Sequence, residues 1–414
     1  MNTKAPIRRA AAALLALSLA GCSLLHAPWT RQAPAPPPVA IAPEPKPAPA
    51  LPEPVATHKF TLGSDDDVVG VVQVTETSKE DTLPDIARRF NVGYEEIVRA
   101  NPGVDPWVPG AGRRIVVPTQ FVLPNAPREG VLINLAAMRI YYFPKHARGE
   151  PQLVYTHPIG VGKVGWVTPE GVTKIIAREK DPTWRPGAGV RKEHAENDDP
   201  LPAVVPPGPD NPLGKYKFTL GWPSYLIHGT NKPYGVGLRS SHGCIRLYPE
   251  DIETFYQMIP LGTSVRVVNQ PFVFGWHAGQ LYLQAYTVFE DDQRSQSKLH
   301  KARLAKSVTP RLGKLLSAAR AQVDWDVVDK LTQAPRGVPV PVSLARTGTG
   351  AEPAAGLEAV LQAAPLVQNR IPPGATWSGA DEVDSDTASF QQMISEREPQ
   401  AAPASNATAA KPQG

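Results

Sequence analysis

The chain contains the stretch His228-Gly229-Thr230-Asn231, followed after a short loop by Ser240-Ser241-His242-Gly243-Cys244-Ile245-Arg246. This stretch holds one of the only two cysteines in the sequence. Free cysteine usually behaves as a small buried hydrophobe among apolar neighbours. Cys244 is flanked instead by His, Gly and Arg, so we interpret it as a reactive thiol.

The other cysteine, Cys22, ends a segment with the features of an export signal. Lys4, Arg8 and Arg9 precede an apolar run, and Leu19-Ala20-Gly21 supplies the small residues of a cleavage site. A Cys directly after them resembles the bacterial lipobox, which implies lipidation of Cys22 and removal of residues 1–21. The apolar run is far shorter than the roughly 20 residues that span a bilayer. Cys244 would then have no cysteine to pair with in an oxidising compartment.

The position after Cys22 bears on location. Ser23 stands where Asp would signal retention at the inner membrane, so the resemblance implies a lipid anchor on the periplasmic face of the cell envelope, at the outer membrane. We expect the membrane, through this anchor, to be one of the partners.

Composition divides the remaining chain into folded and unfolded parts. Of its 414 residues 47 are Pro, and residues 22–66 form a Pro/Ala-rich linker of the extended, semi-rigid kind. Residues 336–414 are low in complexity and predicted to be disordered. The formal net charge of +4 is not clustered, which argues against a nucleic-acid partner.

Residues 67–119 carry a compact β-α-α-β pattern. Leu83, Ile86, Ala87 and Phe90 have helical spacing after the capping residue Thr82. A second short helix is expected to stop before Pro102. The run Asp81-Thr82-Leu83, Ile86-Ala87, Phe90, Val92, Ile97, Asn101-Pro102, Pro109-Gly110 and Ile115-Val116-Val117-Pro118 resembles a LysM domain. That resemblance implies binding to N-acetylglucosamine-containing glycan strands such as those of peptidoglycan.

Two reservations apply to this unit. Glu80 departs from the family pattern, because Gly is usual in that turn. A βααβ spacer whose apolar residues form only a core remains the alternative, since fold alone does not imply function.

Residues 128–269 alternate short β-rich runs with Gly and Pro, which predicts a mainly β sandwich or barrel. The expected strands are residues 131–135, 139–143, 152–155, 172–176, 224–228 and 264–268. One helix is predicted at residues 249–258, where acidic residues fall in the first turn. Residues 270–335 are expected to add a C-terminal hairpin near residues 276–286 and one helix over residues 312–327.

The chemistry of the motif starts from the thiol. A thiolate is the nucleophile, so Cys244 needs a nearby base or cation. His242 and His228 are both candidates, and the sequence alone does not choose between them. An extended backbone would put His242 and Cys244 on one face. The amides of Gly243 and Cys244 are candidates for stabilising an oxyanion, and Arg246 either binds a substrate carboxylate or braces the loop.

Residues 130–268 resemble the L,D-transpeptidase catalytic domain of the YkuD type. The matching motifs are His228-Gly229-Thr230, Ser241-His242-Gly243-Cys244-Ile245-Arg246, Thr168-Pro169-Glu170-Gly171 and Asn211-Pro212-Leu213-Gly214. In that family the Cys attacks the stem tetrapeptide of peptidoglycan between the third-position diamino acid and D-Ala, and D-Ala is released. A second amine then resolves the thioester, and carbapenems inhibit the enzyme.

The resemblance implies roles for individual residues. Cys244 would be the nucleophile and His228 the proton donor and acceptor. The supporting residues would be Ser241, His242, Gly243, Arg246, Gly229 and Thr230. The acceptor amine would belong to another stem peptide, to form a cross-link, or to an outer-membrane lipoprotein anchored to the wall.

Other readings remain open at this point. Water in place of the amine would give an L,D-carboxypeptidase or hydrolase, and a decayed site would leave a protein that only tethers the envelope to peptidoglycan. A zinc site lacks recognisable ligand pairs, so we expect neither a metal nor a cofactor. The Pro-rich insertion over residues 184–209 is long enough to suggest a lid or a wall of the substrate site.

Overall fold

A computed structural model describes residues 50–63, 66–292, 304, 307–347, 350–352, 356–375 and 377. The predicted signal peptide, Cys22 and most of the Pro/Ala-rich linker lie outside these residues. Within them, the structure contains no helix that is both long enough and apolar enough to span a bilayer.

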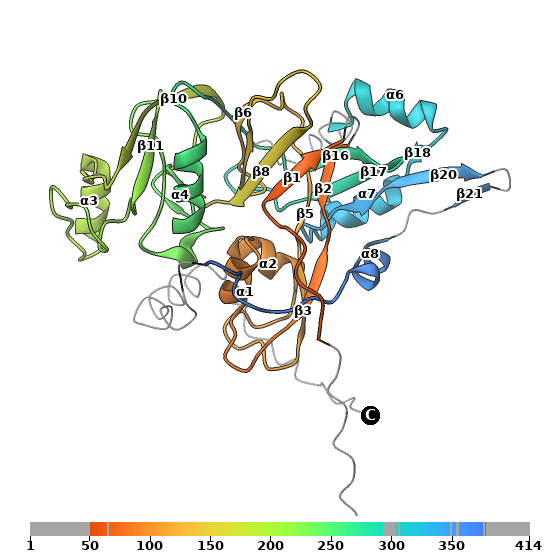
Figure 1. The fold of residues 1–414 in the computed structure, drawn as a ribbon, viewed down its shortest axis with the longest axis horizontal. Helices are drawn as coiled ribbons and strands as arrows, with labels where there is room; N and C mark the ends of the chain where they lie inside the picture. Colours follow the sequence, from red (N-terminus) through yellow and green to blue (C-terminus); the bar gives the residue numbers. More distant parts are fainter. Residues whose placement is uncertain are drawn as a thin grey trace, which may run out of the picture. The chain divides into compact units, whose positions relative to one another are not determined.

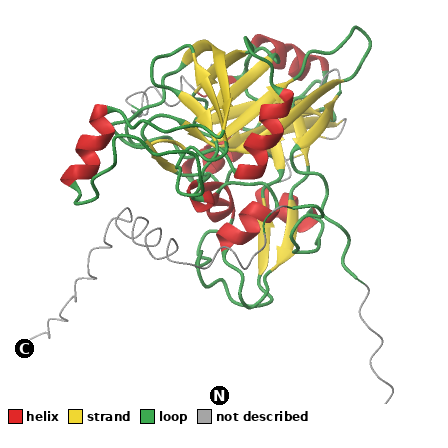
Figure 2. Ribbon diagram, turned by 60° about the vertical axis from the view of Figure 1, so that its left-hand side comes forward, coloured by secondary structure: helices red, strands yellow, loops and turns green. Residues whose placement is uncertain are grey.

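A nine-stranded mixed sheet forms the centre of the described chain (Figure 1), with the order β1-β8-β7-β6-β15-β10-β11-β12-β14. Strands dominate the fold (Figure 2), which confirms the mainly β prediction. All six expected strands are present: β6 (Gly130–Asn134), β7 (Arg139–Phe143), β8 (Gln152–Pro158), β10 (Gly171–Lys180), β12 (Leu226–His228) and β15 (Ser264–Val268). Each is rich in β-branched or aromatic residues, which pack well on a pleated surface.

At the β14 end of the sheet, β12 was expected from the sequence but β11 and β14 were not. β11 (Tyr216–Leu220) buries alternate residues and pairs antiparallel with β12. β12 pairs in parallel with the two-residue strand β14 (Ile245–Arg246). A separate parallel pair joins β9 (Val161–Gly162) to β13 (Arg239–Ser241).

The helix α4 (Pro249–Met258) has the predicted bounds and packs against β11. Pro249 occupies the first turn, where its missing N–H costs nothing. Two acidic residues in that turn, Glu250 and Asp251, complement the positive end of the helix. Ile252 and Phe255 are buried in the largest apolar cluster, together with Ile227 and Ile245. The helix therefore supports the two strands at the β14 end of the sheet.

The predicted βααβ unit is also confirmed. It comprises β3 (Gln73–Glu76), α1 (Leu83–Arg89), α2 (Tyr94–Ala100) and β4 (Arg114–Val117), with β3 paired to β4. Thr82 caps α1 in a reciprocal capping box with Asp85. Glu80 lies in the preceding turn without a positive φ, so this turn does not require the usual glycine.

The linker prediction is wrong at its C-terminal end. Lys59–Leu62 forms β1, which pairs with β8 at the edge of the large sheet. β2 (Val68–Gly70) pairs with β5 (Gln120–Val122), outside the βααβ unit. The valines between Val69 and Val74 suggest a single strand. In the structure, Val69 belongs to the β2–β5 pair and Val74 to the β3–β4 pair.

The single helix predicted over residues 312–327 is also wrong. The chain instead forms α6 (Pro310–Ala318), the short strand β18 (Gln322–Val323) and α7 (Trp325–Gln333). Asp324 caps α7, so a second helix starts where the apolar spacing had suggested continuity. The predicted hairpin is present as β16 (Phe272–His277) and β17 (Gln280–Ala285).

The expectation of disorder from residue 336 onward is wrong for part of that stretch. β19 (Val340–Pro341) extends the hairpin sheet, and β20 (Ser343–Thr347) pairs with β21 (Gly350–Glu352) and β18. The helix α8 (Leu357–Ala363) follows. Residues 378–414 lie outside the described part of the chain.

The segment after α8 completes the βααβ unit. Val74 donates to Pro365 O and accepts from the Val367 amide, both through the backbone. The Val367 side chain is 1% exposed and lies in the same apolar cluster as Leu83 and Phe90. Composition predicted disorder here, because a short segment that pairs with residues distant in the sequence has no pattern of its own that would indicate it.

We expect Val367→Asp to destabilise the protein by about 2–4 kcal/mol, because an unpaired carboxylate would replace a buried methyl pair. Urea unfolding of the purified chain measures this. Ala363→Asp, at an exposed position of α8, is the control and should change stability little. Equal effects of the two substitutions would contradict the packing of this segment.

A buried ion pair joins the βααβ unit to the large sheet. Arg139 on β7 donates through Nε to Glu96 Oε1 on α2 at 2.8 Å, and the two side chains are 0% and 5% exposed. Arg139 also donates to Asn91 O at 2.8 Å, and Glu96 accepts from the Gly93 amide at 2.7 Å. Both members of this pair therefore have further hydrogen-bond partners, as a buried charge requires.

Glu96→Gln should destabilise the protein by about 3–5 kcal/mol, because it leaves the Arg139 charge buried without a counter-charge. The double variant Glu96→Met/Arg139→Met should lose less, since it removes both charges. Urea unfolding compares the two. A single variant that is as stable as the parent would show that the pair does not join the two parts.

Candidate active site

Cys244 lies in a cavity of about 640 Å³ at the β12–β14 edge. The parallel register pairs Ile227 with Ile245 and His228 with Arg246. Side chains alternate between faces along a strand, so residues two apart share a face. Leu226, His228, Cys244 and Arg246 accordingly all line this one cavity. His242 and Ser241 line it as well.

The loop before Cys244 is a tight turn and not an extended strand. An extended backbone was the condition for placing His242 and Cys244 on one face, and this condition is not met. Gly243 adopts φ of +98°, a conformation that favours glycine. Ser241 Oγ donates to Cys244 O at 2.6 Å and accepts from the Gly243 amide at 3.2 Å. The Gly243 amide is thus engaged inside the loop, and a substrate oxygen would have to compete for it.

The Cys244 thiol is partly buried and points its proton at Ser224 O, 3.6 Å away. Burial raises the pKa of this thiol, while the Leu226 amide and the Arg246 charge oppose the rise. The thiol is therefore neutral at rest near neutral pH, and it needs a base to become a nucleophile.

His228 is 4% exposed, and its ring lies 2.6 Å from Gly229 O through Nδ1. A carbonyl accepts only, so Nδ1 carries the proton and Nε2 is left as an acceptor. Burial, reinforced by the Arg246 charge, lowers the pKa of His228 to about 3. His228 is therefore a neutral imidazole at rest, which is the form of a base.

His242 has a different environment. Its ring meets the edge of Trp166, with 4.8 Å between ring centroids. Its Nε2 lies 3.3 Å from Glu193 Oε2, close enough for a charge contact but not aligned for a hydrogen bond. Burial and the charge of Lys163 lower the pKa of His242, and Glu193 opposes them.

Arg246 is a half-buried cation beside the thiol. Its Nη1 donates to Ser240 Oγ at 3.3 Å, whereas its Nε is buried without a partner. Within the part of the chain that the structure describes, no carboxylate forms an ion pair with it. Burial lowers the pKa of this guanidinium, and the negative form of Cys244 opposes that shift.

Gly229 and Thr230 do not line the cavity. Gly229 contributes its carbonyl, which sets the proton position of His228. Thr230 Oγ1 accepts from the Lys232 amide at 2.9 Å, a local turn contact. Gly214 packs directly on both, because a Cβ there would lie 2.7 Å from Thr230 N.

The insertion over residues 184–209 forms one wall of the cavity. It contains the helix α3 (Ala188–Glu196), which the sequence did not predict. This helix lies beside β10 and β11 (Figure 1). Asn211 is buried and donates to Pro182 O and Pro206 O at 2.8 and 3.0 Å, so it closes the base of the insertion. Trp166 and residues 187–190 face Cys244 across the cavity.

No cluster of three or more metal-binding side chains occurs among the described residues. The cavity does hold a thiol (Cys244), a neutral imidazole (His228) and a guanidinium (Arg246), and groups of these three kinds can carry out acyl transfer.

Comparisons with known proteins identify the families of both domains. The L,D-transpeptidase catalytic domain family matches residues 128–267, and the LysM domain family matches residues 78–118. The probable L,D-transpeptidase ErfK/SrfK of Salmonella typhimurium is 37% identical over 64% of this chain and 84% of its own length. The chain belongs to the L,D-transpeptidase family.

Two further relatives extend the comparison. The probable L,D-transpeptidase YbiS of Escherichia coli is 36% identical over 66% of this chain and 88% of its own length. The catalytic domain of the Enterococcus faecium L,D-transpeptidase is 23% identical over 35% of this chain and 99% of its own, with a TM-score of 0.26.

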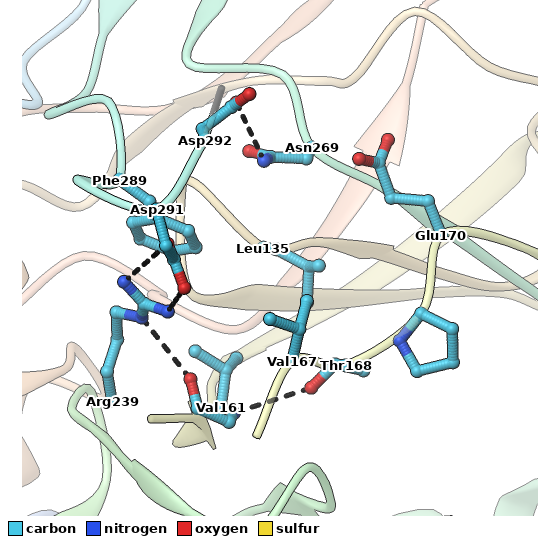
Figure 3. A pocket seen from close by; sticks show the side chains of 12 residues that line it. Leu135, Val161, Val167, Thr168, Glu170, Arg239, Asn269, Phe289, Asp291 and Asp292 are labelled. Carbon is cyan, nitrogen blue, oxygen red and sulfur yellow. Dashed lines mark hydrogen bonds and ion pairs between the residues drawn. The ribbon is translucent and has the colours of Figure 1, made fainter. Parts of the chain in front are cut away.

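This L,D-transpeptidase family member has a second, smaller cavity of about 280 Å³, whose lining includes Thr168, Arg239 and Asp291 (Figure 3). Thr168 Oγ1 lines it and donates to Gly243 O at 2.9 Å. Arg239 forms a two-point contact with Asp291 there, at 3.0 and 2.8 Å. Thr168 therefore holds the turn at Gly243 through this hydrogen bond. The sequence motif around Thr168 did not predict this contact.

The raised pKa of Cys244 predicts how the thiol reacts. In a single-thiol chain carrying Cys22→Ser, iodoacetamide alkylation should keep accelerating from about pH 7 to beyond about pH 9, because the thiolate forms late. Arg246→Gln should slow alkylation at about pH 8 by three- to tenfold, since the guanidinium favours the thiolate. Lys192→Gln, at an exposed site of α3, is the control. A plateau below about pH 8 would contradict the burial argument.

Proposed function

We propose that this protein is a peptidoglycan L,D-transpeptidase that uses Cys244 as nucleophile and His228 as its proton acceptor and donor. The observation that carries the proposal is the parallel pairing of β12 with β14, which brings both side chains to one cavity. Family membership supports the reaction class.

The proposed reaction has two halves. His228 Nε2 takes the proton of the Cys244 thiol as the sulfur attacks the carbonyl carbon between the third-position diamino acid and D-Ala. The carbon–nitrogen bond of the resulting tetrahedral intermediate then breaks as His228 returns the proton to the departing amine, so that D-Ala leaves and the donor peptide stays on Cys244 as a thioester. In the second half His228 deprotonates an acceptor amine, which attacks the thioester and releases the thiol.

His228 suits this task better than His242 for two reasons. Its Nδ1 proton is held by Gly229 O, so Nε2 is ready to accept. His242 directs its Nε2 toward Glu193, on the wall of the cavity. We assign to His242, Ser241 and Gly243 the shaping of the turn.

Arg246 is proposed to bind a carboxylate of the stem peptide. The Arg246 guanidinium lines the cavity and its Nε is buried without a hydrogen-bond partner; a substrate carboxylate entering the cavity would supply the missing charge and align in a two-point contact. This favours binding of a substrate carboxylate over bracing of the loop, the two roles that the sequence allowed.

Arg246→Lys should therefore raise KM more than it lowers kcat, because lysine cannot form the two-point contact.

We further propose that the protein works in the cell envelope. Lipidation of Cys22 would anchor it to the outer membrane at the periplasmic face, and the LysM domain would hold glycan strands near the cavity. The acceptor is then an amine of a second stem peptide or of an outer-membrane lipoprotein.

The test is incubation of the purified chain with tetrapeptide muropeptides, followed by mass analysis of the products. Loss of D-Ala with formation of a dimer supports the transpeptidase. A shortened tripeptide alone selects the hydrolase, in which water replaces the amine. If the parent chain forms no product, both enzymatic functions are contradicted and the tethering role remains.

Variants assign the roles. Cys244→Ala should abolish product, and it should also abolish covalent labelling by a carbapenem. His228→Ala should lower kcat by about a hundredfold or more, the usual contribution of a general base. His242→Ala should retain more activity than His228→Ala, and the reverse order would overturn the assignment of the base.

A further inference from the structure

The helix α3 has almost no apolar attachment to the rest of the protein. None of its residues is buried, although an amphipathic helix normally packs through an apolar stripe. Most of its polar contacts stay inside the insertion: Arg191 donates to Pro186 O, and His194 contacts Asp199. Something else must hold α3 over the cavity.

Two residues of α3 reach the active-site loops: the His194 ring lies against the His242 ring, with 5.7 Å between centroids, and Glu193 makes the charged contacts. One carboxylate oxygen forms an ion pair with Lys163, and the other lies 3.3 Å from His242 Nε2. The backbone amide of Lys163 in turn donates to Ser241 O at 2.9 Å. A single carboxylate thus bridges the loop after β9 and the loop that carries Cys244.

Trp166 completes this attachment. Its indole meets His242 edge-on, and a Cβ added to Gly189 on α3 would lie 2.9 Å from its ring. The ring therefore fits between the helix and the histidine, and only glycine leaves it room. The carboxylate of Glu193 is 28% exposed; its burial favours the neutral acid, but Lys163 and His242 outweigh this and lower its pKa, so Glu193 is charged.

We propose that Glu193 is a positioning residue, which holds the insertion against the His242 loop as the outer wall of the Cys244 cavity and so places the acyl donor. This inference rests on the proposed transpeptidase function for its kinetic part only. The wall itself has a readout that needs no turnover.

That readout is the reaction of the Cys244 thiol with reagents of different size, in the full chain carrying Cys22→Ser. Glu193→Gln keeps the shape of the side chain and removes its charge. We expect it to raise the rate with a bulky fluorescein maleimide about fivefold relative to the rate with iodoacetamide, as the wall loosens. With tetrapeptide substrate, KM should rise by about the same factor and kcat should change less than about twofold.

Glu196→Gln is the matched control. It removes the same charge from the same helix, but Glu196 pairs only with Lys192 at the exposed surface, at 3.7 Å. Both the labelling ratio and KM should match the parent. Lys163→Met should reproduce the effect of Glu193→Gln, and the double variant should be no worse than either single one, because both break one contact.

Three outcomes separate the possibilities. If the parent chain shows no turnover but Glu193→Gln still raises the labelling ratio, the proposed function fails and the wall stands. If Glu193→Gln behaves like Glu196→Gln in both measurements, the inference is overturned. It is also overturned if Glu193→Gln lowers Tm by several degrees, since the carboxylate would then support the fold and not the wall alone.

Discussion

The short parallel pairing between β12 and β14 is the constraint on which the site depends. It consists of two residue pairs, Ile227 with Ile245 and His228 with Arg246. Ile227 and Ile245 point into the core below α4, so the alternate residues must face the cavity. A register slip by one residue would bury the histidine and arginine and expose the isoleucines. Core packing therefore fixes the orientation of His228 and Arg246, and of Cys244 just before β14.

Burial then determines the protonation states in that cavity. Burial raises the pKa of the Cys244 thiol and lowers the pKa of His228, which favours the neutral form of both groups. Arg246 has no carboxylate partner among the described residues, and its Nε has no hydrogen-bond partner. The resting site is thus set up for proton transfer when a substrate arrives, rather than for a permanent thiolate. The Arg139–Glu96 pair shows the contrasting case, because there a buried cation has its counter-charge within the protein.

The contact between the βααβ unit and the large sheet also reaches the site. The amide of Tyr94, at the start of α2, donates to Val236 O at 3.2 Å, in the segment that leads into β13. Arg88 on α1 pairs with Glu250 in the first turn of α4. The LysM domain therefore contacts the segments on either side of the nucleophile loop.

The predictable parts of the fold were those with local signals. Capping by Thr82 marks the start of α1, and the acidic first turn marks α4. β1, β14 and the Val367 segment escaped prediction, because each is short and pairs with residues distant in sequence. Glu193, Lys163 and Trp166 escaped for the same reason: nothing in their separate neighbourhoods indicates that they meet.

By itself the sequence predicted Cys244 as a nucleophile with two candidate bases, because a lone Cys between His, Gly and Arg has few structural explanations. It also determined the family, through four motifs along one domain. Only the tertiary structure decided that His228 Nδ1 faces Gly229 O, that burial raises the pKa of the Cys244 thiol, and that Glu193 on α3 pairs with Lys163. These properties depend on strand register and on loss of water around each group, and neither is encoded in a residue's immediate neighbours.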